Sequence, residues 1–150
     1  MENQRILVIG GTGYIGRELV DNLSKKNKLF VLTRKKGNKK LSVKNVQYCL
    51  GDVTDHSFLS RFLKDFDVVI YLAAIVRTFN KSSYNDNAIG VRNTIDAMNL
   101  NGLKKILYFS TQNVFIKKTG PYGNSKKICE QIIKESGLDY NIVRPNYVYG

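Results

Sequence analysis

The chain has 150 residues, 43% of them hydrophobic and 24% charged, which suits one globular domain covering 1–150 with a core of its own. Its longest apolar run, residues 68–76, is shorter than the roughly 20 residues that a membrane-spanning helix needs, so we expect no membrane partner. The first residues carry an acid and run directly into an apolar strand, so we predict no secretory leader and a cytoplasmic protein.

The formal net charge is +12, and the basic residues concentrate between positions 25 and 44. Such a region is a solvated surface, a site for a phosphate-bearing small ligand, or a nucleic-acid contact. No nucleic-acid motif or basic–aromatic platform accompanies it, so we expect no nucleic-acid partner. His56 is the single histidine and Cys49 and Cys129 are far apart, which predicts reduced thiols and no metal site.

In the first half of the chain, apolar residues alternate between strand and helix spacing. A strand is predicted at 5–9, a helix at 14–25, a second strand at 29–33 and a third at 43–50, with a polar, basic loop at 37–42 between the last two. Gly51-Asp52 ends the third strand, and a short helix is predicted at 56–64.

The second half continues this alternation. A strand at 67–74 is apolar on consecutive residues, which indicates burial on both faces, as in a parallel sheet. A polar loop at 77–83 precedes a long helix at 84–100, and strand 103–110, helix 121–136 and strand 140–143 follow. Strands that alternate with helices in this way predict an α/β fold with a doubly wound parallel sheet of about six strands.

The first strand runs into a glycine-rich turn, Gly10-Gly11-Thr12-Gly13-Tyr14-Ile15-Gly16, and a helix follows. Glycines permit a tight turn and let the backbone approach a pyrophosphate, while the helix N-terminus offers free N–H groups to the anion. A purely structural turn is the alternative. In this context we predict a dinucleotide site that includes Gly10, Gly13, Tyr14, Ile15 and Gly16.

The end of the second strand bears on which dinucleotide binds. An acid there would bind the ribose 2′-hydroxyl of NAD, but the sequence reads Thr33-Arg34-Lys35-Lys36. A guanidinium at Arg34 could bind a 2′-phosphate, or it is one more surface charge. We therefore favour NADP(H), with NAD as the alternative.

Tyr122 and Lys126 lie four residues apart in a predicted helix and so share a face. An adjacent ammonium favours the phenolate and is expected to lower the pKa of Tyr122, so that it can exchange a proton near neutral pH. Ser110 and Thr111 end the preceding strand, which places them with this pair at the carboxyl edge of the sheet, where ligands bind in such folds.

Taken together, these motifs resemble the extended short-chain dehydrogenases/reductases, the NAD(P)-dependent epimerase/dehydratase family with a Rossmann fold. The resemblance spans the whole chain in order. It is carried by the glycine turn, Gly51-Asp52-Val53, Ile70-Tyr71-Leu72-Ala73-Ala74, Asn87, Ser110-Thr111, Tyr122 with Lys126, and Arg144-Pro145-Asn146-Tyr147-Val148-Tyr149-Gly150.

The resemblance implies a role for each matching residue. Tyr122 would be the acid/base, Lys126 would hold the nicotinamide ribose, and Thr111 would hydrogen-bond the reacting oxygen. The expected cofactor contacts also include Asp52 and Val53 at the adenine, Ala73 and Ala74 in the groove, Asn87 near the active site, and Pro145 and Val148 at the nicotinamide.

Three departures limit the functional prediction. Sugar 4,6-dehydratases of the family carry an Asp-Glu pair after the threonine, whereas Gln112-Asn113 stand here and cannot supply acid/base chemistry. Ten residues separate Thr111 from Tyr122, a shorter loop than in many sugar-nucleotide enzymes. In the family a last strand and a substrate domain follow this sequence, so we expect the substrate domain to be absent.

These motifs predict hydride transfer at the alcohol or ketone of a small-molecule substrate, with a nucleotide sugar as one candidate. We expect this piece alone to bind NADP(H) weakly and to turn over little. A homodimer through helices 84–100 and 121–136 is also implied by the resemblance. The alternative function is a non-catalytic NADP-binding sensor or assembly subunit on the same fold.

Overall fold

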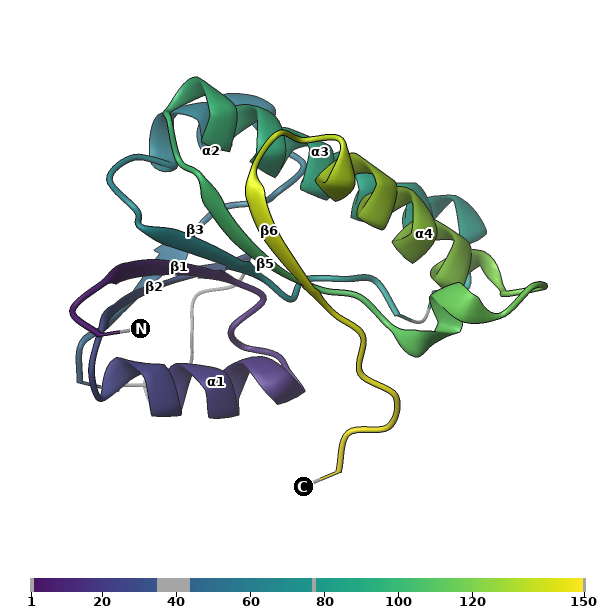
Figure 1. Ribbon diagram of the computed structural model, residues 1–150, viewed down its shortest axis with the longest axis horizontal. Coiled ribbons are helices and arrows are strands. Elements are labelled where there is room, and N and C mark those ends of the chain that lie inside the picture. Colours follow the sequence, from purple (N-terminus) through teal and green to yellow (C-terminus); the bar gives the residue numbers. More distant parts are fainter. Residues whose placement is uncertain (1, 35–43, 77, 150) are drawn as a thin grey trace.

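One parallel sheet organises the molecule, and its strands follow the classical 321456 order of a doubly wound fold. The computed structural model describes residues 2–34, 44–76 and 78–149 (Figure 1). The strands are β1 (Arg5–Ile9), β2 (Lys28–Thr33), β3 (Val46–Leu50), β4 (Val68–Tyr71), β5 (Lys105–Phe109) and β6 (Asp139–Val143). All neighbours are parallel, in the order β3-β2-β1-β4-β5-β6, which confirms the predicted Rossmann fold.

Helices cover both faces of this sheet, although unequally. They are α1 (Tyr14–Ser24), α2 (His56–Phe62), α3 (Asn85–Leu100) and α4 (Pro121–Lys134), with short 3-10 helices η2 (Lys81–Tyr84) and η3 (Gln112–Phe115). In Figure 1, α1 lies on one face, whereas α2, α3 and α4 lie together on the other. No helix within the described ranges is long and apolar enough to cross a membrane.

The buried strand residues form two apolar clusters, one on each face of the sheet. Val8, Val31 and Ile70 pack with Val20 of α1, and Leu7 packs with residues of α2, α3 and α4 on the opposite face. All four residues of β4 are buried, which explains why its apolar positions are consecutive rather than alternating. The two clusters fix the sheet between its helical layers.

Most predicted elements are present with shifted ends. Predicted strand 67–74 ends at Tyr71, because the backbone N–H groups of Leu72 and Ala73 both donate to the Ile9 carbonyl, at 2.8 and 3.1 Å, and the chain turns away. The 3-10 turn η2 replaces the predicted start of the long helix at Tyr84. Loop 37–42, Val43 of the predicted third strand, Lys35, Lys36, Lys39, Lys40 and Arg77 lie outside the described residues.

An ion pair between the buried Glu130 and the half-buried Arg144 joins α4 to the segment after β6. Both carboxylate oxygens of Glu130 accept hydrogen bonds from the Arg144 guanidinium at 2.8 Å, and Lys134 lies 3.6 Å away. Burial alone would raise the pKa of Glu130, but the hydrogen bonds and charges of its basic partners outweigh burial and hold that pKa below its ordinary value. The pair therefore stabilises the folded chain while Glu130 is ionised.

We expect Glu130→Gln to lower the free energy of unfolding by about 2 kcal/mol at neutral pH, because it removes charge-assisted hydrogen bonds. The folded-state pKa of Glu130 lies below its unfolded value of 4.5, so this contribution is present above that value and is lost as pH falls through the folded pKa. Urea unfolding of wild type and Glu130→Gln, from neutral pH to below 4.5, measures this contribution to the free energy of unfolding. The exposed Asp96→Asn is the control. A difference that stayed constant into acid would contradict the assignment.

Candidate active site

The glycine turn joins β1 to α1, and no side chain caps the N-terminus of that helix. Gly10 has a φ of +88°, a conformation that favours glycine, and its carbonyl accepts from the Gly13 N–H at 3.1 Å. Gly13 caps α1 without a side-chain hydrogen bond. Tyr14 is exposed at the first position of the helix and Ile15 is half-buried. The turn therefore presents backbone N–H groups and the positive end of a helix to an anion.

Close backbone contacts explain where the glycines stand. A Cβ on Gly16 would lie 2.5 Å from the Gly10 carbonyl oxygen, and a Cβ on Gly10 would lie 2.6 Å from the Ala73 nitrogen. The turn is thus packed against its own helix on one side and against the end of β4 on the other. These contacts put the turn at the point where the sheet order reverses, between β1 and β4.

The residues predicted to hold the adenine half follow β2 and β3. Arg34 is exposed directly after β2. The Asp52 carboxylate accepts from the backbone N–H and the hydroxyl of Thr54, both at 2.9 Å, so it shapes its own turn. Asn93 of α3 donates to the Val53 carbonyl at 3.0 Å and fixes that turn against the helix. These residues share the carboxyl edge of the sheet with the glycine turn.

The segment after β4 continues along the same edge. Ala73 and Ala74 are half-buried and follow directly on the glycine contact. Asn87 of α3 is 5% exposed, and its amide makes two bonds to the backbone of Ile75, at 2.7 and 3.1 Å. The same amide donates to the Ser125 hydroxyl of α4 at 3.1 Å. Asn87 therefore binds protein groups on two sides of the candidate site.

Tyr122 and Lys126 occupy the first two turns of α4, but their electrostatics differ from the expectation. Burial, followed by the nearby Cys129, raises the pKa of Tyr122 rather than lowering it. The Lys126 ammonium donates to the Phe109 carbonyl at 2.6 Å and lies 4.3 Å from the centre of the Tyr108 ring. Lys126 is thus held by the end of β5 in this state, and it does not depress the pKa of Tyr122.

Burial lowers the pKa of Lys126 to about 8, although Cys129 and Glu130 act to raise it. The side chain is 1% exposed. An ammonium at such a site keeps its proton at neutral pH but gives it up more readily than a surface lysine does.

The remaining predicted residues follow β5 and β6. The Thr111 hydroxyl accepts from the Asn113 N–H at 3.3 Å and begins η3. The carbonyl of Pro145 accepts from the Gln112 N–H at 3.1 Å, which brings the segment after β6 beside η3. Val148 is 46% exposed and lies in the extended C-terminal stretch that leaves the sheet in Figure 1.

Sequence reasoning missed two buried residues beside the Tyr122–Lys126 pair. Ser125 is 5% exposed and its hydroxyl donates to the Tyr122 carbonyl at 2.7 Å, while Glu130 holds Arg144. Glu130 stands four residues beyond Lys126, so the same helical spacing that pairs Tyr122 with Lys126 could have identified it. Ser125 gave no comparable signal, since its role depends on Asn87, which is 38 residues away.

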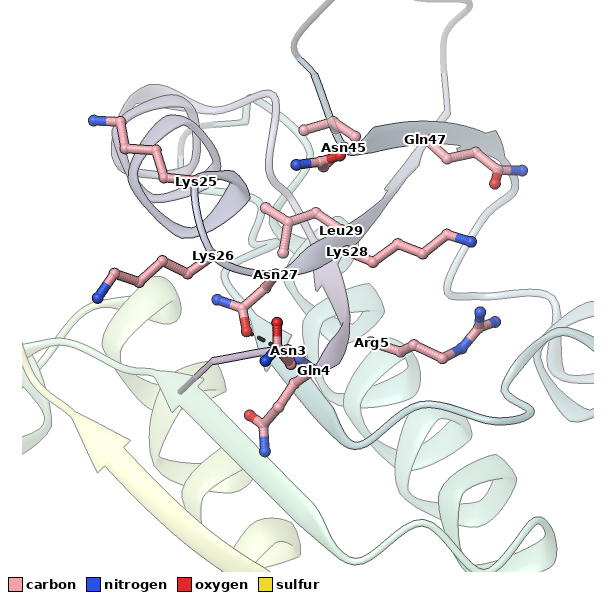
Figure 2. Close-up of a pocket in the computed structure, with 11 residues that line it drawn as sticks. Asn3, Gln4, Arg5, Lys25, Lys26, Asn27, Lys28, Leu29, Asn45 and Gln47 are labelled. Carbon is pink, nitrogen blue, oxygen red and sulfur yellow. Dashed lines mark hydrogen bonds between the residues drawn. The ribbon is translucent and has the colours of Figure 1, made fainter.

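A second basic region lies at the opposite edge of the sheet and is separate from this site. A hollow of about 780 Å³ at the amino ends of β1, β2 and β3 is lined by amide side chains and by Arg5, Lys25, Lys26 and Lys28. Figure 2 shows that these cations diverge, with Lys25 and Lys26 pointing to one side and Arg5 and Lys28 to the other. The Asn27 amide stabilises the fold, because it accepts a hydrogen bond from the Gln4 N–H and donates one to the Leu23 carbonyl. The hollow thus presents no converging cations.

No cluster of three or more His, Cys, Asp or Glu side chains that could hold a metal occurs in the parts of the chain that the structure describes. Cys129 is buried and Cys49 is half-buried, and both are free thiols.

A family profile described as NAD(P)H-binding matches residues 10–149. The chain belongs to this family. The match begins at the glycine turn and extends through the segment after β6, so it contains every residue of the candidate site described above. Together with the relatives below, it confirms the resemblance to the extended short-chain dehydrogenases/reductases.

Several named relatives are nucleotide-sugar enzymes. The chain is 30% identical to UDP-glucose 4-epimerase of Streptococcus mutans, over 91% of this chain and 48% of that protein. It is 32% identical to an inverting UDP-N-acetylglucosamine 4,6-dehydratase of Campylobacter jejuni, over 86% and 42%. The solved UDP-N-acetylglucosamine 4-epimerase of Bacillus cereus has a TM-score of 0.79 at 28% identity and covers 95% of this chain and 53% of that chain. The family member described here thus spans about half the length of the relatives it matches.

We expect Gly16→Ala to lower the free energy of unfolding by about 2 kcal/mol, although alanine is the better helix former by about 1 kcal/mol. The new methyl group would lie against the Gly10 carbonyl and force the turn away from α1. Urea unfolding measures the change. Gly120→Ala is the control, because a Cβ there meets nothing within 4 Å. If Gly16→Ala raised the free energy of unfolding, the turn would have to move away from the new methyl group at little cost.

Proposed function

We propose that this chain is the cofactor-binding half of an NAD(P)-dependent oxidoreductase or epimerase acting on a nucleotide sugar. The observation that carries the proposal is the placement of the glycine turn and the Tyr122–Lys126 pair on the same edge of the sheet, around its reversal point. The glycines at positions 10 and 16 let the turn pack closely against Ala73 and against α1, and the N-terminus of that helix would then suit a pyrophosphate.

The chain's own residues supply binding, orientation and proton transfer. When bound, the nicotinamide would accept or return a hydride. Tyr122 would hold the proton that leaves or returns to the reacting oxygen, and the hydroxyl of Thr111 would orient that oxygen. Lys126 would bind the nicotinamide ribose, either through another N–H of its ammonium or by exchanging the Phe109 carbonyl for a ligand hydroxyl. Such an exchange would bring its charge nearer to Tyr122 and lower the raised pKa of the phenol.

The substrate class rests on the relatives. Those compared above are named for UDP-linked sugars, and the chain is similar to them over 86% to 95% of its length. A 4-epimerase reaction is favoured over 4,6-dehydration, because Gln112 and Asn113 carry amides that neither accept nor release protons at neutral pH. Ile89 and Ile128 are exposed on the adjoining helices α3 and α4, which supports a homodimer through these helices.

For the cofactor we favour NADP(H), on the position of Arg34. Arg34→Ala is expected to weaken NADPH binding about tenfold while leaving NADH binding unchanged, because only NADPH carries the 2′-phosphate. Fluorescence titration with both nucleotides measures this, and Lys28→Ala at the opposite edge of the sheet is the control. An equal change for the two nucleotides would assign Arg34 to the surface and favour NAD.

The catalytic part of the proposal is tested by turnover. We expect the 150-residue chain to bind NAD(P)H but to convert UDP-glucose at a negligible rate, because it spans about half the length of its relatives. Any measurable conversion should disappear in Tyr122→Phe with little change in NAD(P)H affinity. Conversion is followed by chromatographic separation of UDP-glucose from its product, because an epimerase returns the hydride to the sugar and leaves the nucleotide absorbance unchanged. Nucleotide binding is followed by fluorescence titration. Conversion that survives in Tyr122→Phe would favour a different proton donor, and failure to bind either nucleotide would refute the proposed function.

A further inference from the structure

We infer that Asn87 and Ser125 act together as a positioning pair, which holds the wall of the cofactor groove at a fixed distance from the helix that carries Tyr122 and Lys126. The inference rests on the proposed cofactor site and adds the residues that set its width. Asn87, which the resemblance places among the expected cofactor contacts, and Ser125 both act in this inference through the protein groups that they hold.

The pair forms a continuous chain of hydrogen bonds across three segments. The Asn87 amide accepts from the Ile75 N–H at 2.7 Å and donates to the Ile75 carbonyl at 3.1 Å. It also donates to the Ser125 hydroxyl at 3.1 Å, and that hydroxyl donates to the Tyr122 carbonyl at 2.7 Å. The chain therefore runs from the segment after β4, through α3, to the first turn of α4.

Burial makes this chain of bonds hard to replace. Asn87 and Ser125 are each 5% exposed, so water has little access to these two side chains, and the bond between them is buried. Both N–H groups of the Asn87 amide have partners, which leaves it no donor for a ligand. Removing either side chain would leave a buried polar group without its partner, and the segments would then be free to separate.

A second contact from the same part of the chain reinforces the pair. Tyr84, just before α3, donates its hydroxyl to the Val76 carbonyl at 3.2 Å, and its ring lies 6.5 Å from that of Tyr122. The groove wall and the catalytic helix are therefore both tied to the start of α3. A ligand between these two segments would bind more tightly when their separation is already fixed, because less free energy is then lost in ordering the site.

The hydrogen bonds of the Asn87–Ser125 pair lie only at the nicotinamide end of the proposed groove. This placement makes the inference testable. The glycine turn and the Asp52–Val53 turn would hold the adenine and the phosphates, whereas the tied segments border the nicotinamide half. Loss of the pair should therefore weaken ligands that carry the nicotinamide and spare ADP, which has the adenine and two phosphates. A general loss of structure would weaken both alike.

The experiment titrates ADP and the better-bound of NADPH and NADH into wild type, Asn87→Ala and Ser125→Ala. We expect each variant to bind the dinucleotide about tenfold more weakly while its affinity for ADP stays within about twofold. Asn99→Ala is the matched control, because it removes an amide-to-carbonyl bond from the exposed side of the same helix, to Ser136 at 3.3 Å. This control should leave both affinities unchanged.

The outcomes separate this inference from the proposed function. If wild type binds neither nucleotide, the proposed function fails and the inference fails with it. If wild type binds the dinucleotide, two results overturn the inference alone. In one, both variants lose affinity for ADP as much as for the dinucleotide. In the other, neither variant loses affinity for either ligand. Thermal unfolding is recorded for every protein, and if Asn87→Ala does not fold, the smaller Ser125→Ala change decides the matter.

Discussion

The fold and the candidate site both depend on how the chain leaves β1 and β4. The Ile9 carbonyl at the end of β1 accepts from the N–H groups of both Leu72 and Ala73, and Gly10 then packs against the Ala73 backbone. This contact ends the pairing of the two central strands and sends the chain to opposite faces of the sheet, toward α1 on one and α3 on the other. In doubly wound sheets, ligands bind at this reversal point of the strand order.

The electrostatic interactions of Tyr122 and Lys126 differ from those predicted from the sequence. A tyrosine and a lysine on one helical face suggested a phenol activated by its neighbour, yet the Lys126 ammonium reaches back to the Phe109 carbonyl and the Tyr108 ring. Spacing along a helix shows that two side chains share a face, but not which partner each one chooses. Here the Phe109 carbonyl at the end of β5 accepts from the ammonium at 2.6 Å, which makes it a closer acceptor than the phenol.

Particular residues show how far the sequence determines this structure. Alternating apolar segments and the glycine turn predicted six strands, their parallel arrangement and the edge that carries the site, because these follow from local periodicity and turn chemistry. Strand ends such as Tyr71 could not be predicted, since they depend on hydrogen bonds to Ile9, 62 positions away. Ser125 was missed for the same reason: its importance comes from Asn87 on another helix.

The weakly held proton of Lys126 has one further consequence. With a pKa of about 8, this ammonium is close enough to neutrality for its charge to respond to what lies beside it. An anionic ligand beside Lys126 would favour the charged form, so ligand and proton would bind cooperatively. Association would then draw a fraction of a proton from solution, and its measured heat would depend on the ionisation enthalpy of the buffer.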